Sequence, residues 1–487
     1  MFFNSINFAV FLPIVLFLYW FVAKGKLKFQ NLILLFSSYF FYACWDYRFL
    51  FLLIFSTFLD YFTGIKMFEA ASEKRKKTWF WISVGINLGF LGVFKYYNFF
   101  ADSFKDALDL VGFKAEFWTL NIILPVGISF YTFHGLSYVI DIYKIRIKPE
   151  RNFIDYSVFV SFFPLLVAGP IERATHLLPQ IQNERKFDYA KTVEGLQQIL
   201  WGLFKKVVIA DGCAEYANLI FNNLGDFQGV SLVLGSVFFS VQIYCDFSGY
   251  SDIALGTARL FGIDLLRNFA YPYFSRNIAE FWRRWHISLS SWFKDYLYIP
   301  LGGSKGTLYK TVRNTLIIFI VSGFWHGANW TFIIWGLLHA IYIIPSIVFK
   351  KNRNHLNTVA EGRIIPSFND LLAIFITFSL VNFAWIFFRS PTVNSAFNFI
   401  SSMFTGIFSW SSYSHTYDFI VEDVGVLLLF FILFLFLTEW MGREYSNPLS
   451  FFSKVLPKTF LYFLYYCIIF CIIIYYGNEQ QFIYFQF

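Results

Sequence analysis

Residues Thr315–Phe349 read TLIIFIVSGFWHGANWTFIIWGLLHAIYIIPSIVF. This stretch contains no Asp, Glu, Lys or Arg, and it is long enough to pass twice through a hydrocarbon core that needs roughly 20 residues per helix. The basic run Lys350-Lys351-Asn352-Arg353 follows directly. Because basic residues collect on the cytoplasmic side of a membrane, the stretch predicts a transmembrane hairpin that returns to the cytoplasm.

Comparable apolar runs recur on both sides of this hairpin. Hydrophobic residues make up 57% of the 487 residues and charged residues only 14%, which is outside the range of soluble globular proteins. The runs are continuously apolar instead of alternating, which argues against a β-barrel. The sequence therefore predicts an all-α polytopic membrane protein with roughly 11 to 13 transmembrane or re-entrant helices. We expect a single integral membrane domain over residues 1–487, with N-terminal helices in 1–150, a motif-bearing core in 151–350 and C-terminal helices in 351–487.

The flanking charges predict an orientation. The first run, Ile6–Val22, has lysines after it, no basic residue before it and no small-residue cleavage pattern, so we expect a retained helix instead of a signal peptide. The positive-inside rule then places both the N-terminus and the C-terminus outside the cytoplasm. Tyr156–Ala168, which is short and contains Pro164, is expected to be re-entrant. The other expected spans are Asn31–Cys44, Phe49–Ile65, Trp79–Phe94, Trp118–Ile140, Gly195–Phe221, Val230–Cys245, Leu371–Phe388, Val424–Met441 and Phe460–Tyr476.

The net charge of +8 suits anionic lipid headgroups or an anionic cytoplasmic cosubstrate, although basic cytoplasmic loops alone account for it. Nothing in the sequence indicates a nucleic-acid partner. The five cysteines lie in or beside apolar runs without metal-like spacing, so neither a disulfide framework nor a metal site is expected. A Gly-rich phosphate loop, a GxSxG elbow and an HExxH motif are all absent from the sequence.

The segment from Tyr271 to Lys310 departs from simple membrane crossing. Its first part reads YPYFSRNIAEFWRRWHISLSSWFKDYLYIPLGGSK, with aromatic, basic and polar residues interleaved. Such a composition favours an interfacial or re-entrant segment that lines a cavity, and an amphipathic helix that only anchors the fold is the alternative. The basic residues that can hold phosphates or lipid headgroups here and just beyond are Arg283, Arg284, Lys294, Lys305, Lys310 and Arg313.

His326 places an imidazole inside the second half of an apolar run. Ionisable residues at membrane depth usually face the protein interior or a watery path, and they indicate function. Gly323 and Gly327 allow a helix or a ligand to approach the ring, while Ser322 lies nearby and Asn329 is expected to share its helical face and orient it. A neutral histidine is a suitable general base in a poorly hydrated site, although a buried structural histidine is an equally good interpretation from position alone.

Other polar residues are secondary candidates. His286, which follows Trp285, is the second candidate for the reacting centre, whereas His339 and His134 are expected to be packing residues. Asp246 and Asp252 lie near the end of an expected span, where they either shape a chamber or make structural hydrogen bonds, the second being favoured. The remaining histidines lie in polar connections: His176, His355 and His415.

Four motifs together resemble the membrane-bound O-acyltransferase superfamily, and most closely its bacterial alginate O-acetyltransferase branch. They are Phe281-Trp282-Arg283-Arg284-Trp285-His286-Ile287-Ser288-Leu289-Ser290 with the following Tyr298-Ile299-Pro300-Leu301-Gly302-Gly303-Ser304, then Phe324-Trp325-His326-Gly327-Ala328-Asn329-Trp330, Tyr244-Cys245-Asp246-Phe247-Ser248-Gly249-Tyr250-Ser251-Asp252, and Ala168-Gly169-Pro170-Ile171-Glu172-Arg173. The final Phe482-Ile483-Tyr484-Phe485-Gln486-Phe487 is similar to that branch's terminus.

The resemblance implies a helical fold with a central funnel and tunnel, in which His326 is essential and His286 has a more variable role. It implies a bacterial cell membrane location and a cytoplasmic acyl donor, commonly acetyl coenzyme A, with no permanently bound cofactor. The acceptor is then a hydroxyl of an extracytoplasmic polysaccharide, and a separate extracytoplasmic acetyltransferase or polymer-synthesis complex is the expected partner, besides membrane lipids. Three alternatives stay open: D-alanyl transfer in teichoic-acid modification, a transporter or flippase for an anionic lipid-linked substrate, and a scaffold that docks a secreted transferase.

Overall fold

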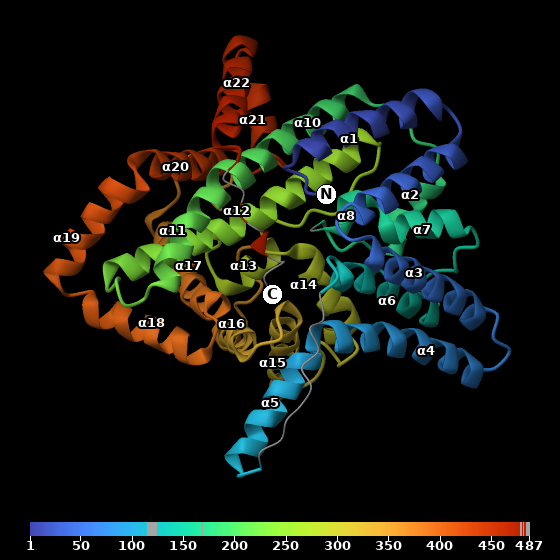
Figure 1. The fold of residues 1–487 in the computed structure, drawn as a ribbon, viewed down its shortest axis with the longest axis horizontal. Helices are drawn as coiled ribbons and strands as arrows, with labels where there is room; N and C mark the ends of the chain where they lie inside the picture. The colour runs from blue at the N-terminus through green and yellow to red at the C-terminus, as the bar shows by residue number, and fades with distance from the viewer. Residues whose placement is uncertain (114–123, 168, 478–479, 481, 484–487) are drawn as a thin grey trace. The chain divides into compact units, whose positions relative to one another are not determined.

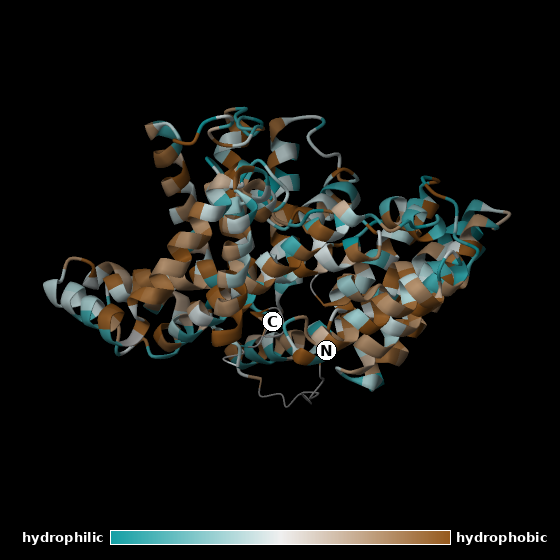
Figure 2. Ribbon diagram, turned by 90° about the horizontal axis from the view of Figure 1, so that it is seen from above, coloured by the Kyte–Doolittle hydropathy of each residue, from teal (hydrophilic) through white to brown (hydrophobic). Residues whose placement is uncertain are grey.

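The computed structural model describes residues 1–113, 124–167, 169–477, 480 and 482–483. Within these residues the chain forms helices and no β-strand, so the all-α prediction is confirmed (Figure 1). Figure 2 shows hydrophobic residues along most of the helices, while the connecting loops are largely hydrophilic. The first part of the expected span Trp118–Ile140, residue Ala168 and the last four residues lie outside the described residues.

The helices fall into two compact units, residues 1–195 with 257–266, and residues 196–256 with 267–487. The boundaries expected at residues 150 and 350 stay a prediction. The first unit contains α1 (Ile6–Phe17), α2 (Leu27–Ala43), α3 (Tyr47–Phe68), α4 (Glu73–Leu91), α5 (Tyr97–Leu110), α6 (Ile128–Tyr143), α7 (Phe153–Ser161), α8 (Phe163–Leu166), α9 (Ala174–Gln182) and the first part of α10 (Tyr189–Leu203).

The second unit carries the rest of the chain. Its helices are α11 (Asp211–Asn222), most of α12 (Val230–Leu260), α13 (Ile278–Arg284), α14 (Ile287–Phe293), α15 (Leu308–His326), α16 (Trp330–Val348), α17 (Phe368–Arg389), α18 (Val393–Gly406), α19 (Trp410–Phe419), α20 (Val426–Met441), α21 (Pro448–Val455) and α22 (Lys458–Tyr475). Two π-helical turns also belong to it, η3 (Phe204–Ala210) and η5 (Lys294–Tyr298).

Five helices of the described residues, α3, α12, α16, α17 and α22, are long and apolar enough to cross a membrane, and a sixth span results if the bent pair Trp410–Glu422 and Val426–Met441 is one span. Other expected spans are shorter or more polar helices. The described part of the expected segment Tyr156–Ala168 contains the end of α7 and all of α8, which have nine and four residues and are too short to cross alone.

The predicted end of one span at Cys245 is wrong. The helix α12 continues for 31 residues to Leu260, so Asp246 and Asp252 lie inside it. The helix stays buried beyond Cys245 because its carboxylates have cationic partners. Lys206 Nζ lies 2.8 Å from Asp246, and Lys205 Nζ lies 2.5 Å from Asp252. A prediction from hydropathy alone ends this span at Cys245, because the acidic Asp246 follows it.

The predicted hairpin over Thr315–Phe349 is confirmed as the pair α15 and α16, which lie side by side (Figure 1). Glycine makes the close approach possible. A Cβ atom on Gly323 would collide with the backbone oxygen of Phe332, and one on Gly336 would collide with the backbone oxygen of Phe319. Small residues at the contact let two membrane helices approach along their backbones. This contact fixes the end of α15, where His326 lies.

In the first unit, the motif after Ala168 supports packing. The buried Glu172 donates its backbone N–H to His134 Nε2 at 3.1 Å, and its carboxylate accepts the backbone N–H of Leu266 at 2.6 Å. His134 is therefore a packing residue, as expected.

Candidate active site

His326 is the last residue of α15, and its side chain is only 5% exposed. Gly327 follows with extended backbone, which ends the helix. The imidazole lies edge-on to Trp335, with ring centroids 5.1 Å apart, and Phe388 is the next ring at 5.6 Å. The aromatic walls keep water away, so polar partners of this imidazole are stronger than they would be in solvent.

Asn329 does not share a helical face with His326, and that prediction is wrong because the helix has already ended. Asn329 caps α16: its Oδ1 accepts the Thr331 backbone N–H at 3.0 Å. Its Nδ2 donates to the backbone oxygen of Pro391 at 2.8 Å. The side chain therefore holds the turn after His326 instead of orienting the ring.

His286 is the second histidine of the site, and it lies at the junction between α13 and α14. Its backbone adopts the left-handed conformation (φ 42°, ψ 54°), which is uncommon for a non-glycine residue and typical of functional sites. The side chain is 2% exposed, and its ring centroid lies 6.4 Å from that of His326. The structure thus brings together the two histidines that the sequence named.

Asn268 fixes the orientation of His286, and sequence reasoning missed it. The amide oxygen of Asn268 lies 2.9 Å from His286 Nδ1 and also accepts the Ser288 hydroxyl at 2.9 Å. The Asn268 backbone oxygen accepts the Ile287 N–H at 2.8 Å. An amide oxygen only accepts, so His286 carries its proton on Nδ1 and Nε2 is the acceptor nitrogen. No motif marks Asn268, because it lies 18 residues before the ring it holds.

Burial lowers the pKa of His286 well below its ordinary value, and the neighbouring His326 lowers it further. Desolvation disfavours the charged imidazolium, and a second positive charge close by does the same. His286 lies outside the five helices long enough to cross a membrane. Both causes favour the neutral imidazole, which suits a hydrogen-bonding role beside a reacting group.

His339 accepts the indole N–H of Trp282 on Nδ1 at 3.2 Å and stacks on Phe281, with ring centroids 6.1 Å apart. It is completely buried on α16. These contacts make it a packing residue of the aromatic core, as expected.

A cavity of about 390 Å³ lies between α13, α14, η5, α15 and α16. Neither His286 nor His326 lines it, but Ile287 and Ser322 do. Hydroxyl groups of Ser290, Ser291 and Ser322 line it together with apolar side chains such as Ile318 and Ile347. Ser322 precedes His326 by one helical turn on α15, so both side chains point to the same face. The cavity therefore extends to within one turn of the candidate base.

The six basic residues named from the sequence have different surroundings. Only Arg283 and Lys294 line the cavity. Arg284 is paired with the buried Glu280, with 2.9 Å between Nη2 and Oε1. Three others are exposed residues that do not line it: Lys305, Lys310 and Arg313.

The supporting residues named from the sequence pack around the site. Trp285 is buried and stacks on Phe281, with ring centroids 5.5 Å apart. Asp246 and Asp252 form the ion pairs with Lys206 and Lys205 described above, which gives both a structural role. The two buried lysines, which lie within the expected span Gly195–Phe221, were not among the candidates named from the sequence.

In the part of the chain that the structure describes, no group of three or more His, Cys, Asp or Glu side chains is arranged to hold a metal ion.

Comparison with known proteins shows the family of the chain. Residues 146–388, which contain both histidines and Asn268, match the membrane-bound O-acyltransferase family. A probable alginate O-acetylase from Pseudomonas aeruginosa is 37% identical over 449 residues, covering 92% of this chain and 82% of that protein. A peptidoglycan O-acetyltransferase from Helicobacter pylori is 38% identical, covering 81% and 77%. A teichoic acid D-alanyltransferase from Bacillus subtilis is 29% identical over 278 residues, covering 55% and 69%.

The chain therefore belongs to the membrane-bound O-acyltransferase family, as a multi-pass membrane enzyme that transfers acyl groups to hydroxyls. Within that family it is similar to the alginate O-acetylase branch, as its motifs indicated. The transporter alternative has no support from these relatives.

Proposed function

We propose that this enzyme transfers an acetyl group from a cytoplasmic acyl coenzyme A thioester to a hydroxyl of an extracytoplasmic polysaccharide, either directly or through a partner transferase. The single observation that carries the mechanism is the buried pair of His286 and His326, whose ring centroids lie 6.4 Å apart. A hydroxyl-lined cavity reaches Ser322, one helical turn before His326. The substrate class rests on relatives that bear the names alginate O-acetylase and peptidoglycan O-acetyltransferase.

In this mechanism His326 acts as the general base. It takes the proton of the acceptor hydroxyl as that oxygen attacks the carbonyl carbon of the thioester. The new C–O bond forms, the C–S bond breaks, and the thiolate leaving group takes up the proton from the imidazolium. Base catalysis of this kind contributes about 10²- to 10⁴-fold in rate. His286, held by Asn268, orients or polarises the reacting group through its Nε2 side.

The donor reaches His326 through the cavity between α13 and α16, which ends one turn from the ring. Its mixed lining suits a thin chain that carries both amide and methylene groups, because hydroxyls alternate with isoleucine and phenylalanine side chains. No permanently bound cofactor is part of this proposal, since the acyl thioester is consumed as a substrate.

We place the enzyme in the bacterial cytoplasmic membrane, with both termini on the extracytoplasmic side. This follows from the basic runs that flank the apolar stretches. A separate extracytoplasmic acetyltransferase or polymer-synthesis complex is the proposed partner, and the surrounding lipids contact the exposed apolar helix faces. A nucleic-acid partner has no place in this arrangement.

The decisive experiment replaces His326 with alanine in cells that lack the native gene. We expect polymer acetylation to fall at least about 10²-fold, because the base is lost. A matched control is His415→Ala, since His415 is an exposed histidine on α19. Immunoblots of the membrane fraction verify equal amounts of both variants. Normal acetylation in the His326→Ala cells would contradict the proposal.

A second candidate is D-alanyl transfer to teichoic acid, which the similarity to the Bacillus subtilis enzyme supports over a smaller share of the chain. Mass spectrometry of the modified polymer separates the two candidates. An added mass of one acetyl group supports the first, and an added mass of one alanyl group supports the second.

A further inference from the structure

The connection between α16 and α17 carries a basic segment, residues 350–357, that we call the basic loop. Lys350, Lys351 and Arg353 are exposed on it, and it contains no acidic residue. The loop starts in a defined way: the backbone N–H groups of Lys351 and Asn352 donate to the Ser346 carbonyl at 2.7 and 3.0 Å. These hydrogen bonds cap the C-terminus of α16 and fix the backbone of the first residues of the loop.

Arginine side chains hold the basic loop in place. Arg283 donates to the backbone oxygens of Asn352, Asn354 and His355 at 2.9, 3.0 and 3.2 Å. One guanidinium therefore binds three carbonyl groups of the loop backbone. The planar fork of an arginine, with its several N–H donors, suits this bridging role.

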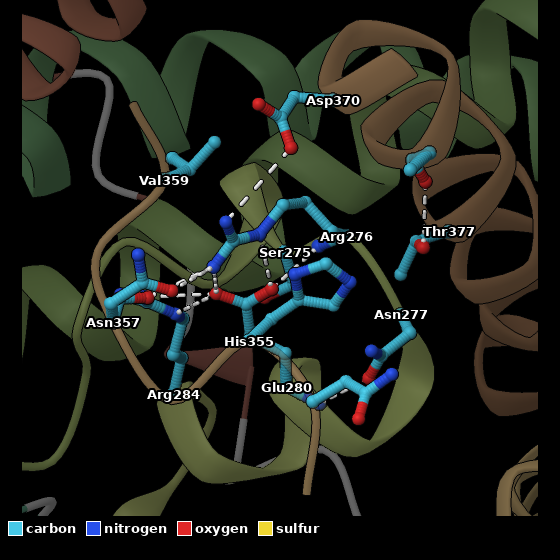
Figure 3. Close-up of polar contacts among 12 residues, drawn as sticks. Ser275, Arg276, Asn277, Glu280, Arg284, His355, Asn357, Val359, Asp370 and Thr377 are labelled. Carbon is cyan, nitrogen blue, oxygen red and sulfur yellow. Dashed lines mark hydrogen bonds and ion pairs between the residues drawn. The ribbon is translucent and has the colours of Figure 1, made fainter. Parts of the chain in front are cut away.

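A second anchor holds the end of the loop (Figure 3). The buried carboxylate of Glu280 pairs with Arg276 and Arg284, and both arginines donate to the backbone oxygen of Asn357, at 2.9 and 3.2 Å. Arg283 and Arg284, which the sequence named as phosphate ligands, are thus directed to the loop backbone. Their hydrogen-bonding capacity is largely used within the protein.

The basic loop borders the cavity between α13 and α16, which Ser322 of α15 also lines. Asn352 lines that cavity together with Ile343 and Ile347 from the end of α16, and the exposed Lys294 lines it from η5. A volume of about 390 Å³ lies near the lower end of ligand sites. The cavity can hold a slender thioester arm, but a nucleotide with its phosphates must remain outside, beside the loop.

We infer that Lys350, Lys351 and Arg353 of the basic loop, together with Lys294, bind the phosphates of a nucleotide thioester donor while its arm occupies the cavity. This inference rests on the proposed function and names the recognition site for its donor. Exposed cations are hydrated and screened, so they contribute modestly each and act mainly by attracting the anion. Arg283, Arg276 and Arg284 hold the backbone of the basic loop in position. The exposed cations of the loop supply the positive charge that attracts the phosphates.

The test measures equilibrium binding of two probes, coenzyme A and pantetheine, to the full-length protein in lipid nanodiscs. The variant is Lys350→Asn with Lys351→Ala and Arg353→Ala; asparagine is chosen because Lys350 has a positive φ of 56°. A matched control removes three exposed basic residues from the first turn of α4, with Lys74→Ala, Arg75→Ala and Lys77→Ala.

We expect coenzyme A to bind the loop variant roughly tenfold more weakly than the native protein, because three exposed charge pairs are lost. Pantetheine affinity and the α4 control should stay unchanged, and the salt dependence of coenzyme A binding should flatten in the loop variant. Equal coenzyme A affinity in the native protein and the loop variant would overturn the inference. So would a native protein that binds pantetheine as tightly as coenzyme A. Loss of acetylation in His326→Ala cells is a separate result, so the proposed function can stand if the donor site fails.

Discussion

Asn268 holds the ring of His286 in one orientation, which neither histidine of the site can do by itself. Its amide oxygen receives two donors, from His286 and Ser288, and this sets the tautomer of the ring. Asn268 Nδ2 is buried and has no hydrogen-bond partner among the described residues. The hydrogen bonds of its oxygen are therefore the contacts through which Asn268 positions the ring.

The first prediction at this scale concerns Asn268→Asp. A carboxylate that accepts the Nδ1–H favours the imidazolium, so the pKa of His286 rises from its lowered native position. If neutral His286 is needed, transfer slows near neutral pH and recovers as the pH rises, and the acid limb of the rate profile shifts to higher pH. The profile of initial acetyl-transfer rate against pH measures this shift.

Two further variants, Asn268→Leu and Ser288→Ala, separate the effect of the Asn268 oxygen on His286 from its effect on Ser288. Leucine removes the acceptor, and a misplaced ring should lower kcat by roughly 10²-fold at every pH. Ser288→Ala removes only the other donor and should behave almost as the native enzyme. A parallel loss in Asn268→Asp and Asn268→Leu, without any change in the shape of the pH profile, would assign Asn268 a purely structural role.

At the scale of elements, the contact between α15 and α16 decides where His326 lies. Gly323 and Gly336 face backbone atoms of the opposite helix, with no space for a side chain. We predict that Gly323→Ala destabilises the protein by about 1–3 kcal/mol, because the backbones must separate. Activity should fall with it, since α15 carries His326 at its end.

Thermal unfolding of the purified protein in detergent measures this effect. Gly89→Ala is the matched control: Gly89 is also a helical glycine, on α4, but a Cβ atom there meets nothing within 4 Å. An unchanged melting temperature in Gly323→Ala would mean that the two helices do not pack through this glycine.

At the scale of the second unit, two buried lysines join helices that are distant in the chain. Lys205 lies 2.5 Å from Asp252 and 3.7 Å from Glu439, which come from α12 and α20. Lys206 binds Asp211 and Asp246 at 2.7 and 2.8 Å. Charges inside a membrane protein are tolerated when they are paired, and these pairs connect α11, α12 and α20 through η3.

We predict that Lys205→Met costs about 3–5 kcal/mol, because it leaves the buried Glu439 and the partly buried Asp252 without their cation. The double variant Lys205→Met with Asp252→Asn should recover a large part of that loss, since one of the stranded charges is removed. The fraction of protein that stays folded in detergent on heating measures both. Equal stability of the single and double variants would argue against the pairing.

The sequence alone determined the membrane class, the α15 and α16 hairpin, and the two histidines of the candidate site. These depend on local properties: apolar runs of a given length, and motifs in which the informative residues are neighbours. The branch of the family followed from the same motifs.

Only the tertiary structure decided which groups support the histidines and which arginines remain available. Asn268 contacts His286, Arg283 binds the basic loop, and Lys205 pairs with Asp252. Many residues separate the partners in the chain, so composition and periodicity cannot predict these contacts. Two predictions from the sequence were wrong. Asn329 does not share the His326 helix, because Gly327 ends that helix and Asn329 begins the next one, as glycine and asparagine commonly do. The helix α12 continues past Cys245, because its acidic residues find their partners only in the folded chain.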